Sequence, residues 1–266
     1  MNLYADLRWP AFAERYANDL NAFAREVCVT HLGDRLVDAA GAFEQGECRR
    51  LVLHNSGTRP SQGLVLGVIA LWHIATRPQS TTVLGYPLGS ACETYKAIGE
   101  LLAYIKRGPH YWLARGIKHR AGGWFAGGML RSTIDLRRLT AKDTEAAHGC
   151  YLPHLLWLVE DGDHLPAACL SAIQDTMTQH DNGLVVACDW YVPRSLMALV
   201  RARSATPWSL IDMGGLSRPA PAQRQERYQG ELREFIELVA GKPLTPSQAA
   251  CLTDLLQDLP GAQTPA

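Results

Sequence analysis

Short apolar segments that alternate with helix-like segments constrain the fold of this chain more than any other feature. Arg50–His54, Leu155–Val159 and Gly183–Cys188 are apolar at nearly every position rather than at every second one. Such strands are buried on both faces, which is typical of a parallel sheet covered by helices on both sides. Further strands are expected at Thr81–Gly85 and Trp208–Met213. The sequence therefore predicts an α/β fold with a mainly parallel sheet.

Helical periodicity marks most of the segments between these strands. The expected helices cover residues 8–45 (in two pieces, the second at 34–43), 63–76, 91–106, 165–178 and 191–204. Residues 107–150 are rich in Gly, Arg, Lys and His, and they are expected to hold short strands and loops with Gly-Gly turns at 121–123 and 126–128.

The composition changes near Gly214, where "GGLSRPAPAQRQ" is typical of a linker. Two helices are expected after it, at 226–240 and 246–259, the second opened by a capping box with proline at its first position. Three parts are therefore predicted: an N-terminal helical segment (1–45), an α/β core (46–215), and a linker with a C-terminal helical appendage (216–266).

Bulk properties exclude several classes of protein. The chain has 266 residues and a formal net charge of +0, so no global basic field attracts nucleic acid and any DNA contact must come from local patches. Its 7 cysteines form no CxxC pair and are expected to be reduced, as in a cytosolic protein. Neither a signal peptide nor an apolar run long enough to span a membrane is present.

Two predicted strand ends carry residues typical of nucleotide hydrolysis. After Arg50–His54, the segment from Ser56 to Gly63 leads into an apolar helix, and free N–H groups at a helix start bind phosphates. After Leu155–Val159 come Glu160, Asp161 and Asp163, and an apolar strand ending in acids can place one acid on magnesium and another on the attacking water. A solvated acidic turn is the other interpretation of the second strand end.

Over roughly residues 8–213 the sequence resembles the ATPase domain of the large subunit of viral (phage) terminases. The resemblance is carried by "RWPAFAERYANDLNAFAREVC", by "RRLVLHNSG" with "ALWHIATRPQSTTVLGYP", by "HGCYLPHLLWLVEDGDHLP" and by "NGLVVACDW", in the family's order and spacing. It implies a three-layer RecA-like P-loop NTPase fold, with ATP and Mg²⁺ as cofactors.

The resemblance also implies roles for individual residues. Glu160 falls on the magnesium-associated acid, Asp161 on the catalytic glutamate and Asp163 on a further acid that could help to hold magnesium. The phosphate loop falls on Ser56, Gly57, Thr58, Arg59, Ser61, Gln62 and Gly63.

The departures from the family's pattern are concentrated at the positions that bind the nucleotide and magnesium. The loop lysine is replaced by Gln62 and the magnesium-binding hydroxyl by Gly63, while Pro60 removes a backbone donor. Arg59 could supply the missing charge. The two acids appear as Glu-Asp rather than Asp-Glu, the usual Trp-Gln adenine contact is missing, and Cys188-Asp189-Trp190 stands where Gly-Asn-Pro is common.

Two functions follow from this pattern. The first is a terminase-like ATPase that couples ATP hydrolysis to the translocation or packaging of double-stranded DNA, with Arg59, Glu160 and Asp161 as its catalytic residues. The second is a pseudo-ATPase that keeps the fold as a structural or DNA-binding subunit. Too few residues follow Met213 for the family's nuclease domain, so we expect this chain to lack it. The expected setting is the cytoplasm of a bacterial host, with further copies of the chain, a small terminase subunit, a portal or a separate nuclease as partners.

One stretch is both basic and aromatic. Its members are Arg107, Tyr111, Trp112, Arg115, Lys118, His119, Arg120, Trp124, Phe125, Arg131, Arg137 and Arg138. Basic groups interleaved with stacking aromatics suit a DNA backbone. A solvated charged surface over the sheet edge is the other interpretation.

Overall fold

The computed structural model describes residues 2–30, 32, 49–54, 59–87, 92–129, 131–140, 152, 154–188, 192, 196 and 208–212. The chain divides into two compact units, Met1–Met213 and Gly214–Ala266, and every described residue lies in the first. The helix predicted at 34–43, nearly all of the one at 191–204 and both C-terminal helices lie outside the described residues.

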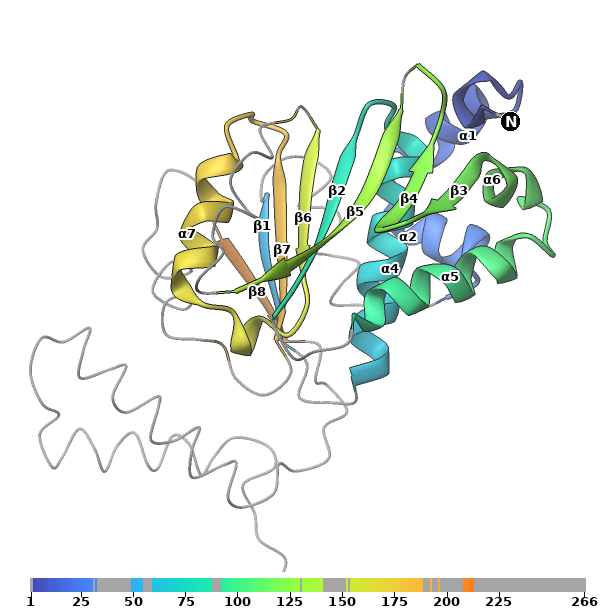
Figure 1. The fold of residues 1–266 in the computed structure, drawn as a ribbon. Helices are drawn as coiled ribbons and strands as arrows, with labels where there is room; N and C mark the ends of the chain where they lie inside the picture. Colours follow the sequence, from blue (N-terminus) through green and yellow to red (C-terminus); the bar gives the residue numbers. More distant parts are fainter. Residues whose placement is uncertain are drawn as a thin grey trace, which may run out of the picture. The chain divides into compact units, whose positions relative to one another are not determined.

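Eight strands of the described residues form one sheet, in the order β3-β4-β5-β2-β6-β7-β1-β8 (Figure 1). The six strands from β5 to β8 in this order run parallel, and only the hairpin β3–β4 at one edge is antiparallel. The predicted mainly parallel sheet is therefore confirmed. The strands are β1 Arg50–His54, β2 Thr81–Pro87, β3 Ile117–Arg120, β4 Gly123–Ala126, β5 Ser132–Leu139, β6 Leu155–Val159, β7 Gly183–Cys188 and β8 Trp208–Asp212.

Helices cover both faces of this sheet. The helices are α1 Trp9–Tyr16, α2 Leu20–Ala22, α4 Arg59–Thr76, α5 Glu93–Ile105, α6 Tyr111–Gly116 and α7 Ala167–Thr176, with shorter helical turns η1 Leu3–Ala5, η2 Phe23–Val27 and η4 Gly162–His164. In Figure 1, α4 and α5 lie on one side of the sheet and α7 on the other. The architecture is a three-layer α/β fold, as predicted.

Strand residues alternate between two hydrophobic cores, one on each face. Leu51 and Leu53 of β1 belong to the core that also contains α4 and α5, whereas Val52 belongs to the core that contains α7. Trp72 of α4 and Trp157 of β6 are both fully buried, one in each core. The central strands are apolar at consecutive positions because both of their faces are covered.

The helix after β1 begins earlier than the periodicity indicated. α4 starts at Arg59 rather than at Gly63, so the residues between them form its first turn and not a loop. Pro60 is compatible with this start because the first N–H groups of a helix have no partner within the helix. The sequence prediction also missed α6, whereas the turn at Gly122 and Gly123 is confirmed, with φ of +81° and +152°.

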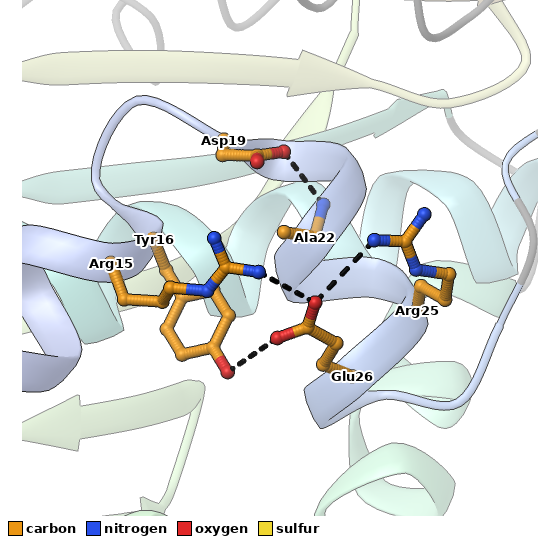
Figure 2. A network of polar contacts seen from close by, with 6 residues as sticks. All are labelled: Arg15, Tyr16, Asp19, Ala22, Arg25 and Glu26. Atoms are coloured by element: carbon orange, nitrogen blue, oxygen red, sulfur yellow. Dashed lines mark hydrogen bonds and ion pairs between the residues drawn. The ribbon is translucent and has the colours of Figure 1, made fainter.

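The N-terminal helices are held together by one polar network (Figure 2). The carboxylate of Glu26 accepts hydrogen bonds from Arg15 at 2.8 Å, from the Tyr16 hydroxyl at 3.0 Å and from Arg25 at 3.4 Å. Asp19 accepts from the backbone N–H of Ala22 at 2.7 Å and so caps α2.

The same segment is attached to the end of α4. The indole N–H of Trp72 donates to the Tyr16 carbonyl at 2.7 Å, and that of Trp9 donates to the Ala75 carbonyl at 2.9 Å. The guanidinium of Arg77 donates to the Ala17 carbonyl at 3.0 Å. These bonds join the segment to the same side of the sheet as α4. In the part of the chain that the structure describes, no helix is long and apolar enough to cross a bilayer.

Candidate functional site

Three segments meet at the carboxyl edge of the parallel sheet: the start of α4 after β1, the acidic turn after β6, and the start of α5 after β2. Of the predicted phosphate loop, Ser56, Gly57 and Thr58 lie outside the described residues. Arg59 and Ser61 are described only as backbone in the first turn of α4. The described part of the site therefore consists of Gln62, Gly63, the acidic turn and the start of α5.

The carboxylate of Glu160 caps α5. One of its oxygens accepts a hydrogen bond from the backbone N–H of Glu93 at 3.1 Å, and the other accepts from the N–H of Thr94 at 3.3 Å. Cys92, at the N-cap position of α5, makes no side-chain capping bond. Glu160 thus satisfies orphan N–H groups that a local capping residue would ordinarily satisfy, and its negative charge faces the positive end of the helix dipole.

Gly63 lies against the same turn of α5. A Cβ atom added at Gly63 would come 3.0 Å from the carbonyl carbon and Cβ of Glu93 and 3.1 Å from the amide nitrogen of Thr94. This spacing is tighter than ordinary van der Waals contact, so a serine or threonine fits here only if α5 moves. The first turn of α5 therefore contacts both Gly63 and Glu160.

Gln62 is buried at the start of α4. Its side chain is 2 % exposed, and its amide nitrogen Nε2 has no hydrogen-bond partner. A buried donor without a partner costs about 1–3 kcal/mol, so this atom lowers the stability of the fold. A neutral amide here supplies none of the charge of an ammonium group.

The acidic turn is buried rather than solvated. Glu160, Asp161 and Asp163 are 5 %, 3 % and 5 % exposed, which excludes the interpretation as a solvated acidic turn. Asp161 adopts a left-handed conformation with φ of +52°, which aspartate tolerates better than most residues. A Cβ at Gly162 would collide with Val186 and would lie 2.9 Å from the sulfur of Cys188, so the turn packs directly against β7.

Burial also shifts the pKa values of two side chains at this edge of the sheet. Burial raises the pKa of the Glu160 carboxyl, and the charge of Asp161 raises it further, whereas hydrogen bonds from Cys92 and Thr94 oppose the rise. Burial, with the neighbouring Glu160 carboxylate, likewise raises the pKa of the Cys92 thiol. Within the described ranges, Cys28, Cys92, Cys169 and Cys188 are free cysteines.

The described residues Gln62 and Gly63 lack the ammonium and hydroxyl groups with which an active phosphate loop holds a magnesium-bound nucleotide. Position 63 offers no hydroxyl, and a side chain there would require α5 to shift by a few tenths of an ångström, while both oxygens of Glu160 accept hydrogen bonds from α5. The lysine position holds the amide of Gln62.

Solved structures with a similar fold were found, although no protein-family model and no curated protein matches the chain. The ATPase domain of the Thermus phage P74-26 large terminase aligns with a TM-score of 0.50 at 12 % identity, over 85 % of this chain and 94 % of that domain. The fold is that of a large-terminase ATPase domain. The RecA-like fold expected from the resemblance is therefore confirmed.

A second similar structure is the large terminase of the thermophilic bacteriophage D6E in complex with ADP. It aligns with a TM-score of 0.46 at 11 % identity, over 81 % of this chain. This chain spans 49 % of the length of that terminase.

Only some side chains of the basic and aromatic stretch lie at the surface of the protein. Trp112 and Trp124 are 3 % and 4 % exposed and belong to the core, so they cannot stack on bases. The guanidinium of Arg131 lies 4.6 Å from the centre of the Phe125 ring, which it covers. Exposed cations remain at Arg107, Arg115, Lys118, Arg131, Arg137 and Arg138. This surface suits phosphate contacts better than base stacking.

Proposed function

We propose that this chain is a pseudo-ATPase with the large-terminase ATPase fold, acting as a structural or DNA-contacting subunit that does not hydrolyse ATP. The observation that supports this most strongly is the position of the first turn of α5, which contacts Gly63 and binds both oxygens of Glu160. The resemblance places two of the magnesium ligands at these positions, with Asp163 as a further acid.

The contact gives Glu160 a structural role in place of a catalytic one. A carboxylate whose oxygens accept two backbone N–H groups is stabilised where it is, and turning it towards a metal would leave the N–H groups of Glu93 and Thr94 without partners. The neutral Gln62 removes the charge that would favour a γ-phosphate, and losing such a charge inside a site costs several kcal/mol. Both changes act against hydrolysis.

DNA contact in this proposal comes from exposed cations at one side of the sheet. Arg137 and Arg138 lie near the end of β5, just before Leu139, and Lys118 lies on the edge strand β3. Each cation that neutralises a DNA phosphate releases counterions, so a few of them suffice for weak binding that does not depend on sequence. Double-stranded DNA, further copies of the chain and phage-packaging proteins inside a bacterial host are the partners that we propose.

A terminase-type ATPase that drives DNA translocation is the second candidate. The observation that favours it is the burial of three acids in one turn, Glu160, Asp161 and Asp163, at the carboxyl edge of the sheet, because carboxylates are rarely buried without a role. In this function Asp161 would orient the attacking water, and Arg59 would replace the missing lysine against the phosphates of Mg-ATP.

Phosphate release from ATP distinguishes the two candidates. It is measured with and without double-stranded DNA, for the native chain and for Asp161→Asn, which keeps the size of the side chain. The pseudo-ATPase releases no phosphate above the background in either sample. If DNA stimulates the release of phosphate and the Asp161→Asn variant releases none, the chain is an ATPase instead.

A further inference from the structure

The strands β3, β4 and β5 are packed into a core on one face only, in contrast to the central strands. On the side of α5, Ile117, Trp124 and Ile134 belong to the hydrophobic core. On the side of α7, β3 and β4 contribute no described residue to the core, and β5 contributes only Leu139. Helix α7 packs instead on the other half of the sheet, where Trp157 of β6 is buried (Figure 1). We call the second face of β3, β4 and β5 the open face.

The register of the strands places one row of side chains across the open face. Lys118 of β3 lies opposite Phe125 of β4, and Phe125 lies opposite Thr133 of β5. Successive side chains of a strand point to opposite faces, so Arg137 of β5 shares this face with Thr133. Arg131, just before β5, also reaches the row, because its guanidinium lies 4.6 Å from the centre of the Phe125 ring. The open face therefore combines three cations with one aromatic ring.

The charge of the open face is mainly positive. Asp135 of β5 adds a carboxylate to it, but this carboxylate is ion-paired with Arg120 at 2.5 Å and accepts a hydrogen bond from the Thr133 hydroxyl at 3.1 Å. The three other cations of this face are exposed, and none of them forms an ion pair with a described acidic residue. An exposed positive surface whose own carboxylate is already neutralised attracts the phosphates of a nucleic acid.

The three cations are spread along the face rather than clustered at one point. Neighbouring strands lie about 4.8 Å apart, so Lys118 on β3 is separated from β5 by about 10 Å. Arg137 follows Arg131 by six positions, which is about 20 Å of extended chain. A single phosphate group cannot contact all three cations. The backbone of an extended nucleic-acid strand carries several phosphates over this length.

The pair formed by Arg131 and Phe125 offers one position for a base. The guanidinium lies over the ring, and the Arg131 side chain is exposed. Guanidinium planes and aromatic rings stack on bases that are not already stacked on their neighbours. A duplex keeps the faces of its bases stacked inside, whereas a single strand can present them. The pair therefore favours a single strand over a duplex.

We infer that the open face of β3, β4 and β5 binds single-stranded DNA. Lys118 and Arg137 contact phosphates, and one base stacks on Arg131 where it covers Phe125. Every base has a π-face, so this mode of binding requires no particular sequence. The inference rests on the proposed function, a subunit that contacts DNA, and adds to it the form of the DNA and the face of the sheet that binds it.

The test is fluorescence anisotropy of the full chain with a labelled thymidine oligonucleotide of about 20 nucleotides and with a duplex of the same length. We expect the single strand to bind more tightly than the duplex at each salt concentration. Lys118→Gln and Arg137→Gln should each weaken binding of the single strand. Each should also reduce the slope of log K against log salt by about 0.7, because one phosphate contact is lost.

Phe125→Leu separates stacking from charge. Leucine keeps an apolar side chain on the sheet but removes the ring beneath Arg131, so the single strand should bind about tenfold more weakly with an unchanged salt slope. Lys106→Gln at the end of α5 and Arg25→Gln on η2 remove matched charges from exposed positions outside the open face, and both should bind as the native chain does. The melting temperature of each variant shows that it is folded.

Two kinds of failure can be distinguished. Equal or tighter binding of the duplex would overturn the inference and leave the DNA contact of the proposed function intact. Native affinity of the folded Phe125→Leu variant would also overturn it, as would an equal loss in Lys106→Gln and Lys118→Gln, since the strand would then lie elsewhere. If neither form of DNA binds, the DNA contact of the proposed function is wrong, and this inference is wrong with it.

Discussion

Glu160 and Glu93 are 67 positions apart in the sequence, yet the carboxylate of the first caps the helix that begins at the second. The bond joins the acidic end of β6 to α5, an element that carries no catalytic residue in the sequence interpretation. In the pseudo-ATPase that we propose, Glu160 is a part of the scaffold rather than a magnesium ligand. The predicted stability of Glu160→Ala and the predicted response to Mg-ATP both depend on this contact.

Removing the carboxylate should destabilise the protein. Glu160→Ala leaves the first N–H groups of α5 without their acceptor, and the free energy of unfolding should fall by about 1–2 kcal/mol, as for the loss of a helix cap. Urea denaturation measures this change. The control is Glu100→Ala on the same helix, whose side chain is 71 % exposed and which should change stability by less than about 0.5 kcal/mol. Equal stability of Glu160→Ala and the native chain would contradict the capping role.

Two glycines should respond to alanine with opposite signs. Gly99 lies in α5 with nothing within 4 Å of an added Cβ, so Gly99→Ala should raise stability by about 0.5–1 kcal/mol through helix propensity. At Gly63 the added Cβ meets the backbone of Glu93 at 3.0 Å, and Gly63→Ala should lower stability by about 1 kcal/mol despite the same gain in propensity. Thermal or urea unfolding of both variants checks the difference. A gain in stability at both positions would show that α4 and α5 are not in close contact.

Stability should fall as the solution is acidified, because of His73. The pKa of this buried ring is lowered in the folded state, so below about pH 6.5 the unfolded chain takes up a proton that the folded chain does not. This contribution is complete above that pH and is lost as the pH falls, with a slope of at most about 1.4 kcal/mol per pH unit. Unfolding free energies of the native chain and of His73→Gln between pH 5 and pH 8 should differ in slope by this amount. Parallel profiles would mean that His73 titrates equally in both states.

DNA binding should depend on the cations at the end of β5. Replacing Arg137 and Arg138 with glutamine should weaken binding to duplex DNA and reduce the slope of log K against log salt by up to about 2, if both contact phosphates. Fluorescence anisotropy at several salt concentrations measures the slope. Replacing Arg25 and Lys106, which are also exposed, removes the same charge elsewhere and should leave the slope nearly unchanged. An equal loss in both double variants would indicate only a general effect of charge.

The sequence predicted the positions of the strands well. It did not predict where α4 begins or that α5 binds the acidic end of β6. β1, β6 and β7 have the predicted ends because fully apolar runs bounded by polar or turn residues admit few alternatives. The start of α4 was misplaced because Arg59 and Pro60 are equally compatible with a loop. The bonds from Glu93 and Thr94 to Glu160 had no local signal, since backbone N–H groups are the same in every residue.

The aromatic residues show a second limit of the sequence. Trp112 and Trp124 were grouped with basic neighbours as a candidate surface, but α6 and the hairpin β3–β4 turn both rings into the core. Their burial depends on how an edge of the sheet packs against α5 and α6. Short elements with little periodicity leave that arrangement undetermined at the level of sequence.

Calorimetric titration with Mg-ATP tests the central claim most directly. The account predicts no saturable binding by the native chain up to millimolar nucleotide, because the first turn of α5 contacts Gly63 and holds Glu160. It also predicts that Gln62→Lys combined with Gly63→Ser fails to restore binding, since the serine side chain meets the backbone of α5. Micromolar binding by the native chain that Arg59→Ala abolishes would contradict the account and would establish a phosphate loop with a displaced charge.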